Sequence, residues 1–225
     1  QNLAASTVRN RLAYLKAACR YAWRRHGLTE YDPTGRMELP AVNNARVVLT
    51  PVRDLERLLA AIAHDESRAC FALAFYTGSR WISEIHCRQP GDVIRVGRDI
   101  LLQIGMTKTG TPRTVPVPPA ARWALRYLPF RLGSHSMFQK FAAARTTVGM
   151  AGFRVHDMRH VLGGDIIRRT GSIRDVMDAL HHQSVQSANR YSAMQFGRLK
   201  RILGGVGVGR KTHTSKSRRK LKMAA

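Results

Sequence analysis

The densest group of residues that could carry out chemistry is the segment His156-Asp157-Met158-Arg159-His160. On a helix, positions i, i+3 and i+4 place His156, Arg159 and His160 on one face. Two histidines at this spacing can bind zinc, but Arg159 would put a positive charge beside the ion. Asp157 also stands where zinc hydrolases of this pattern carry a glutamate base. A zinc site is therefore disfavoured, and a hydrogen-bonded core histidine is the ordinary alternative for His156 or His160.

Three other places hold polar side chains that a core would not require. Arg80 opens a predicted helix directly after an apolar one, with Glu84 four residues later on the same face. Lys108 lies at a predicted hairpin turn, and Tyr191 follows His182 by nine residues across a turn. Taken singly, Arg80 with Glu84 is equally well a surface ion pair. Lys108 alone is typical of a solvated turn residue, and Tyr191 alone is typical of an amphipathic residue at a core edge.

The sequence lacks two common sets of catalytic residues. No glycine-rich phosphate-binding loop ending in Lys-Ser or Lys-Thr occurs, and no group of carboxylates suits Mg²⁺. These absences exclude nucleoside triphosphatases and two-metal nucleases. The longest apolar run, residues 69–76, is far shorter than the roughly 20 residues that span a bilayer, and we expect no membrane segment. The first residues do not resemble a signal peptide.

The charge of the chain indicates a polyanionic partner. The 225 residues include 38 Lys and Arg against 14 Asp and Glu, a net charge of +24. Only eight of these basic residues lie in 201–225, so the tail alone does not account for the excess. Nucleic acid is the favoured partner, ahead of an anionic membrane surface. The three cysteines form no C-x-x-C pair and are predicted to be reduced thiols of an intracellular protein.

The elements that must position these residues are mostly helices. With 44% hydrophobic residues the chain can form a real core. Helices are predicted over residues 6–26, 50–62, 68–76, 119–127, 137–148, 157–169, 173–180 and 185–194. The first two show apolar spacing of three to four, whereas the run 68–76 is apolar nearly all round and is expected to be a core helix. Ser6 is the expected N-cap of the first helix, and Thr50 with Pro51 the expected start of the second. Three β-type runs, residues 93–96, 100–104 and 113–117, predict a small antiparallel sheet. The expected fold class is therefore mainly α with a small antiparallel β-sheet (α+β).

In chain order, these motifs resemble those of the tyrosine recombinase (phage integrase) family. That family combines an Arg in T-G-x-R-x-x-E, a hairpin Lys, H-x-x-R, and L-G-H followed about nine residues later by a nucleophilic Tyr. The resemblance covers about residues 50–194, the catalytic domain of the family, and the six matching positions are Arg80, Lys108, His156, Arg159, His182 and Tyr191.

The resemblance implies a role for each of these residues. Two guanidiniums, Arg80 and Arg159, would clamp the oxygens of a DNA phosphodiester, which Lys cannot do in the same bidentate way. Tyr191 would be the nucleophile, His156 a general acid–base, and His182 a hydrogen-bond donor to the phosphate. Lys108 would protonate the leaving 5′-oxygen, and Glu84 would orient Arg80 without touching the substrate.

Three departures from the family pattern are present. His181 replaces the glycine of L-G-H, at a turn where glycine adopts positive φ without cost. Gly163 and Gly164 lie within the helix after H-x-x-R, and Val161 stands where the family often has Thr. None of these changes removes a catalytic group, so they bear on efficiency and local geometry more than on reaction type.

The resemblance also implies a domain organisation. Residues 1–40 would be the last helix of a core-binding domain plus a linker, residues 41–202 the catalytic domain, and residues 203–225 a flexible basic tail. Earlier helices of the core-binding domain do not precede residue 1, which favours a fragment of a longer protein. The expected location is the cytoplasm, either on the bacterial nucleoid or as a phage-encoded protein in its host.

The expected activity is site-specific DNA recombination through a 3′-phosphotyrosyl intermediate, without metal, ATP or any other cofactor. Double-stranded DNA would be the substrate, bound by a homotetramer, with a DNA-bending protein as a possible accessory. One alternative is relaxation of DNA by a type IB topoisomerase-like activity. The others are a catalytically inactive, basic DNA-binding protein and a ribosome-associated RNA-binding protein, which would explain the charge but not the ordered motifs.

Overall fold

The computed structural model describes residues 3–42, 48–105, 112–182, 184–188 and 191. The chain divides into two compact units, Gln1–Val47 and Val48–Ala225. The first unit contains the long helix α1 (Ala5–His26), none of whose residues is buried. Its polar side chains hold the following segment: Arg9 donates to the carbonyl of Pro40, and Lys16 donates to that of Met37.

Helix α1 begins earlier than the sequence suggested. Its N-cap is Ala4, with no side-chain hydrogen bond, so the prediction of Ser6 as the cap was wrong. Ser6 lies within the first turn, where it cannot adopt the extended backbone of a cap. The predicted end was right, because Gly27 adopts the left-handed conformation with φ of 59° and closes the helix.

The second unit is built around α3 (Asp65–Tyr76), which is buried along nearly its whole length as predicted. It contacts α2 (Val52–Ala60), α4 (Pro119–Arg122), α5 (Ser134–Thr147), α6 (Asp157–Thr170) and the 3₁₀-helix Trp123–Tyr127. The largest fully buried apolar side chains here include Leu55, Leu58, Ile62, Phe71, Phe75 and Phe141. Helix α2 begins one residue later than expected, because Pro51 is its N-cap rather than its first helical residue.

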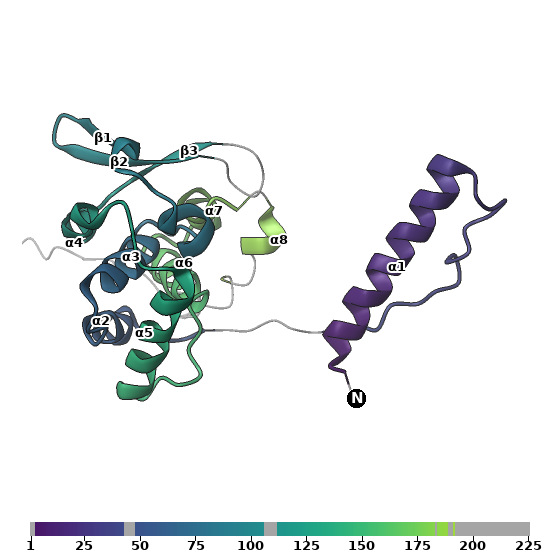
Figure 1. Cartoon of the computed structure of the whole chain (residues 1–225), viewed down its shortest axis with the longest axis horizontal. Helices are drawn as coiled ribbons and strands as arrows, with labels where there is room; N and C mark the ends of the chain where they lie inside the picture. Colours follow the sequence, from purple (N-terminus) through teal and green to yellow (C-terminus); the bar gives the residue numbers. More distant parts are fainter. Residues whose placement is uncertain (1–2, 43–47, 106–111, 183, 189–190, 192–225) are drawn as a thin grey trace, which may run out of the picture. The chain divides into compact units, whose positions relative to one another are not determined.

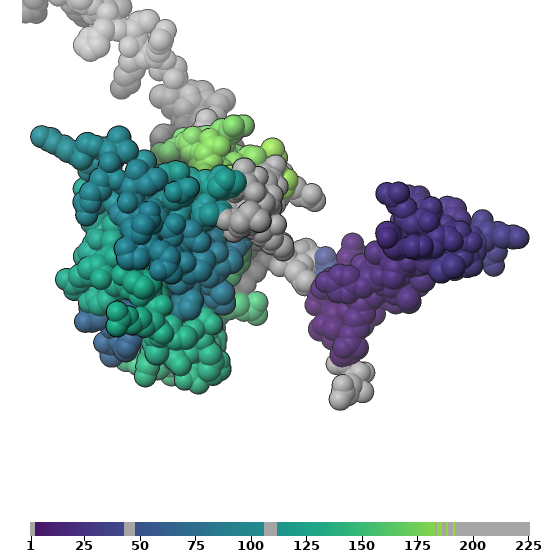
Figure 2. Space-filling model, turned by 45° about the horizontal axis from the view of Figure 1, so that its top comes forward, coloured from purple at the N-terminus to yellow at the C-terminus, as the bar shows by residue number. Residues whose placement is uncertain are grey.

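The predicted small sheet is present at one end of this helical unit (Figure 1). Its antiparallel strands are β1 (Val93–Val96), β2 (Asp99–Ile104) and β3 (Arg113–Pro116), in the order β1-β2-β3. Strand β2 buries Ile100, Leu102 and Ile104 on one face, as the period-2 pattern requires. The β1–β2 hairpin projects from the surface of the unit (Figure 2).

The remaining elements supply the motif residues. A π-helix, η1 (Trp81–His86), follows α3, where the sequence predicted a helix of unspecified type. Helix α7 (Ile173–Leu180) and the short α8 (Val185–Ala188) follow α6. None of the helices in the described part of the chain is long and apolar enough to cross a membrane.

Candidate active site

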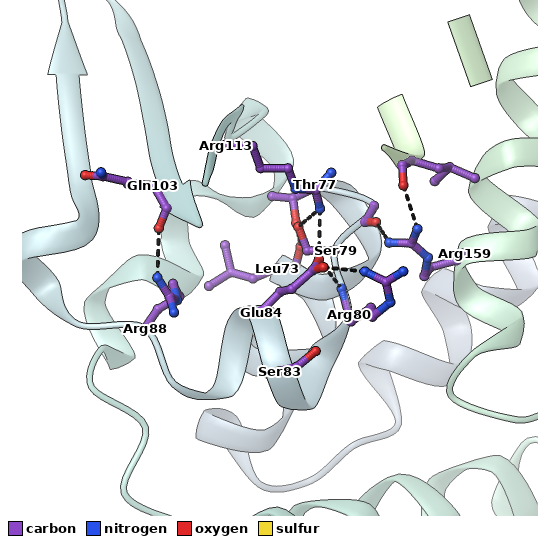
Figure 3. A network of polar contacts seen from close by, with 12 residues as sticks. Leu73, Thr77, Ser79, Arg80, Ser83, Glu84, Arg88, Gln103, Arg113 and Arg159 are labelled. Atoms are coloured by element: carbon purple, nitrogen blue, oxygen red, sulfur yellow. Dashed lines mark hydrogen bonds and ion pairs between the residues drawn. The ribbon is translucent and has the colours of Figure 1, made fainter. Parts of the chain in front are cut away.

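Glu84, on the π-helix, is the centre of a polar network (Figure 3). Its side chain is 1% exposed and accepts the backbone N–H of Arg80 at 2.8 Å and Nη1 of Arg80 at 2.6 Å. It also accepts Nη2 of Arg113 at 2.8 Å. Burial alone would raise the pKa of the Glu84 carboxyl, but these N–H donors and cations together hold that pKa below its usual value. Glu84 is therefore an ionised carboxylate that holds both the backbone and the guanidinium of Arg80.

Arg113 was not among the residues singled out in the sequence. It begins strand β3, its side chain is 8% exposed, and it also donates to Ser79 Oγ at 3.2 Å. Glu84 is 29 residues away in the chain, so no local spacing reveals the pair. One signal was available: Arg113 shares a strand face with the buried Val115, so a charge there had to find a partner.

Arg159, on α6, is held by backbone carbonyls rather than by a carboxylate. It is 5% exposed, and it donates through Nη1 to the carbonyl of Gly78 and through Nη2 to that of Leu180 at 2.6 Å. Burial and then the nearby charge of Arg80 lower the pKa of Arg159 to about 10, so the guanidinium remains protonated at neutral pH. These contacts join the end of α3, helix α6 and the end of α7 at one point.

Three of the predicted side chains line one cavity. Arg80, His156 and Arg159 border a space of about 220 Å³ together with Ser79 and the first residues of the π-helix. The side chain of Arg80 is 39% exposed, and His156 is exposed at the N-terminal end of α6. Such a cavity presents two guanidiniums and an imidazole to an anion entering from solvent.

Tyr191 lies against helix α6, inside the second of two buried clusters. It is 1% exposed, and its hydroxyl lies 3.0 Å from Nδ1 of His160. Its ring is nearly parallel to that of His182, with 6.2 Å between centroids. His181 has a φ of 51°, so the turn that the family closes with glycine is here closed by a histidine in the left-handed conformation.

Lys108 lies outside the described residues, so its predicted place on the hairpin stays a prediction. Among the residues that are described, no group of three or more His, Cys, Asp or Glu side chains could hold a metal ion. The structure thus forms two groups of predicted residues. Arg80, His156 and Arg159 line the cavity, with Glu84 bound to Arg80, and His182 lies with Tyr191 beside α6.

Comparison with solved structures defines the class of fold. The chain has the fold of tyrosine recombinase catalytic domains, as the sequence motifs predicted. No protein-family model and no curated protein matches the sequence.

The individual matches share little sequence identity with the chain. It is similar to the XerH site-specific recombinase bound to palindromic difH substrate, with a TM-score of 0.71, 16% identity, and coverage of 90% of this chain and 67% of XerH. It is also similar to a lambda integrase dimer bound to a COC′ core site, with a TM-score of 0.64, 18% identity, and coverage of 84% of this chain and 73% of the integrase. The Tn1549 transposon integrase in complex with circular intermediate DNA matches with a TM-score of 0.63, 17% identity, and coverage of 89% of this chain and 80% of that integrase.

Proposed function

We propose that the chain is the catalytic part of a site-specific DNA recombinase that cleaves and rejoins strands through a tyrosine nucleophile. The observation that carries the proposal is the meeting of the described motif residues, Lys108 excepted, around α6. Arg159 and His156 face a cavity shared with Arg80, while Tyr191 packs against the same helix. The surplus of basic residues suits a DNA substrate. The similar structures of XerH, lambda integrase and Tn1549 integrase are all bound to DNA.

The proposed reaction is a transesterification at phosphorus. The Tyr191 oxygen forms a bond to phosphorus while the bond from phosphorus to the 5′-oxygen breaks, which leaves a 3′-phosphotyrosyl bond and a free 5′-hydroxyl. Arg80 and Arg159 stabilise the charge that grows on the non-bridging oxygens. His156 takes part as the general acid–base that accepts the phenol proton, and Lys108 gives a proton to the 5′-oxygen. His182 donates a hydrogen bond to the phosphate.

The covalent bond keeps the phosphate in a reactive ester. A 5′-hydroxyl from another strand reverses the same chemistry, so rejoining requires neither ATP nor a metal ion. Exchange between two duplexes requires four protomers, and we propose a homotetramer on DNA, aided by a DNA-bending protein. A cytoplasmic setting, on the nucleoid or during phage infection, follows from this substrate.

The test is a covalent trap on nicked duplexes in the presence of EDTA. The duplexes are candidate attachment sequences and a random-sequence pool, and the readout is a protein–DNA band that resists SDS. We expect a band with the wild type and with Tyr14→Phe, a matched control because Tyr14 is 76% exposed. Tyr191→Phe should abolish the band because it lacks the attacking oxygen.

The other outcomes of this experiment would each contradict a different part of the proposal. A band that survives Tyr191→Phe would assign the nucleophile to another residue. A band that forms only in a parallel reaction with Mg²⁺ and without EDTA would overturn metal independence. Salt-sensitive binding with no band on any duplex would favour the inactive DNA-binding protein. If the band forms, a mixture of two distinguishable duplexes separates strand exchange from relaxation of a supercoiled plasmid, which is the topoisomerase-like alternative.

A further inference from the structure

His160 is a buried polar residue to which the proposed reaction assigns no role. It directly follows Arg159 on α6, is 7% exposed, and its Nδ1 lies 3.0 Å from the hydroxyl oxygen of Tyr191. This is hydrogen-bonding distance for either tautomer. With an unprotonated Nδ1 the ring accepts from the phenol, and with a protonated Nδ1 it donates to the phenol oxygen. In both cases the oxygen that would attack DNA is held by this imidazole.

Gly163 completes the surface on which the tyrosine ring lies. A Cβ at this position would stand 2.7 Å from both Cε1 and Cζ of Tyr191, far inside van der Waals contact, and 2.9 Å from Cδ1 of Leu180. Gly163 stands three positions after His160, so both lie on one face of α6. Gly163, one of the departures from the family pattern, therefore makes room for the aromatic ring, and His160 holds the hydroxyl at the end of that ring.

We infer that His160 is a positioning residue for the nucleophile, and that with Gly163 it forms a seat for Tyr191 on helix α6. The inference rests on the proposed function of Tyr191. Arg159 and His160 are consecutive residues of one helix, so a phenol held by His160 is also held at a fixed place relative to the Arg159 guanidinium. Misplacement of a reacting atom by about 1 Å can cost on the order of 100-fold in rate.

Two substitutions at His160 separate the hydrogen bond from packing. His160→Leu replaces the imidazole by an apolar side chain of similar bulk, and His160→Asn keeps a polar atom near the place of Nδ1. Single-turnover formation of the phosphotyrosyl bond is measured with protein in excess, alongside the Kd for the same duplex. We expect His160→Leu to slow the bond-forming step by about 10- to 100-fold, His160→Asn to restore most of the rate, and the Kd to change less than about twofold in both, since a positioning role acts after binding. A wild-type rate for His160→Leu, or a loss that appears only in Kd, would overturn the inference.

The seat is tested separately through its glycine. Gly163→Ala should slow the same step by about 10-fold or more, because the added methyl group displaces the tyrosine ring. Gly133→Ala is the matched control, since a Cβ there would meet no atom within 4 Å. Equal rates for Gly163→Ala and Gly133→Ala would show that the ring does not need this seat.

A double-mutant cycle, measured as Tm, tests the contact between His160 and Tyr191 without DNA. The Tm is measured for the wild type, Tyr191→Phe, His160→Leu and the double variant. We expect Tyr191→Phe to lower the Tm of the wild type and to leave that of His160→Leu nearly unchanged, because the hydroxyl has then lost its partner. Additive shifts would overturn the contact. If the wild type forms no covalent bond with any DNA, the positioning role falls with the proposed function, while non-additive shifts would still establish the contact itself.

Discussion

The two arginines of the site are held in opposite ways. Arg80 is oriented by an ion pair with Glu84, and its side chain remains 39% exposed. Arg159 is 5% exposed and is fixed by two backbone carbonyls at the ends of α3 and α7. A carboxylate can be replaced without altering the backbone, whereas carbonyls belong to the fold itself. Arg80 can therefore be perturbed through its partner, whereas Arg159 links the cavity that it lines to the packing of three helices.

The largest effect is expected at Arg159. Arg159→Lys keeps a positive charge but cannot direct two N–H groups at two carbonyls and still present donors to a phosphate. We expect covalent bond formation to fall by about 100- to 1,000-fold, and the free energy of unfolding to fall by about 1–3 kcal/mol for the carbonyls left without partners. Arg168→Lys, on the exposed side of the same helix, is the control. Equal losses of rate and stability in Arg159→Lys and Arg168→Lys would show that the carbonyl contacts of Arg159 have no special importance.

Glu84→Gln should have the next largest effect, because it removes the charge shared by Arg80 and the buried Arg113. We expect about 10-fold slower bond formation and about 3 kcal/mol lower stability, since a buried cation loses its partner. The low folded-state pKa of Glu84 stabilises the wild type above the ordinary carboxyl pKa of 4.5, and that contribution is lost as pH falls below 4.5. Chemical denaturation at a series of pH values should therefore show that the free energy of unfolding declines below pH 4.5, and that this decline is smaller in Glu84→Gln than in the wild type.

A smaller effect is expected at Arg113, which supports Arg80 only through Glu84. Arg113→Met removes one of the two cations on that carboxylate and leaves the other in place. We expect the bond-forming rate to fall about threefold to tenfold, less than the loss typical of a direct transition-state donor. Arg95→Met, on the exposed strand β1, should leave the rate unchanged. A loss as large as that of Arg159→Lys would mean that Arg113 itself contacts the substrate.

The smallest effect is expected at His181, which lies beside the Arg159 anchor. His181→Gly relieves a left-handed backbone conformation and should raise the free energy of unfolding by about 0.5–1 kcal/mol. His181→Ala keeps the unfavourable φ and should give no gain, so the difference in Tm between the two variants isolates the backbone effect. If His181→Ala stabilises as much as His181→Gly, the imidazole rather than the backbone is the source of the cost.

The sequence predicted those features of the site that local spacing determines. The buried helix α3 follows from an uninterrupted apolar run, and the three strands and the pairing of Arg80 with Glu84 follow from spacings of two to four residues. The positive φ of His181 also follows, because the matching family position is glycine. What could not be predicted are contacts between residues far apart in the chain, such as Arg113 with Glu84 and His160 with Tyr191. The π-helical winding after α3 has no local signal either, since its residues would equally suit an α-helix.

The carboxylate of Glu84 joins two pieces of chain that are made at different times. Arg80 and Glu84 precede the sheet, whereas Arg113 arrives only with its last strand. Without Arg113, burial of Glu84 would leave its charge only partly compensated, which opposes that burial. We therefore expect Arg80 to gain its final orientation during synthesis only when the sheet closes. In a chain that stops before β3, Glu84 would stay exposed to water, and the Arg80–Glu84 pair and the sheet would be expected to form, and to be lost, in a single step.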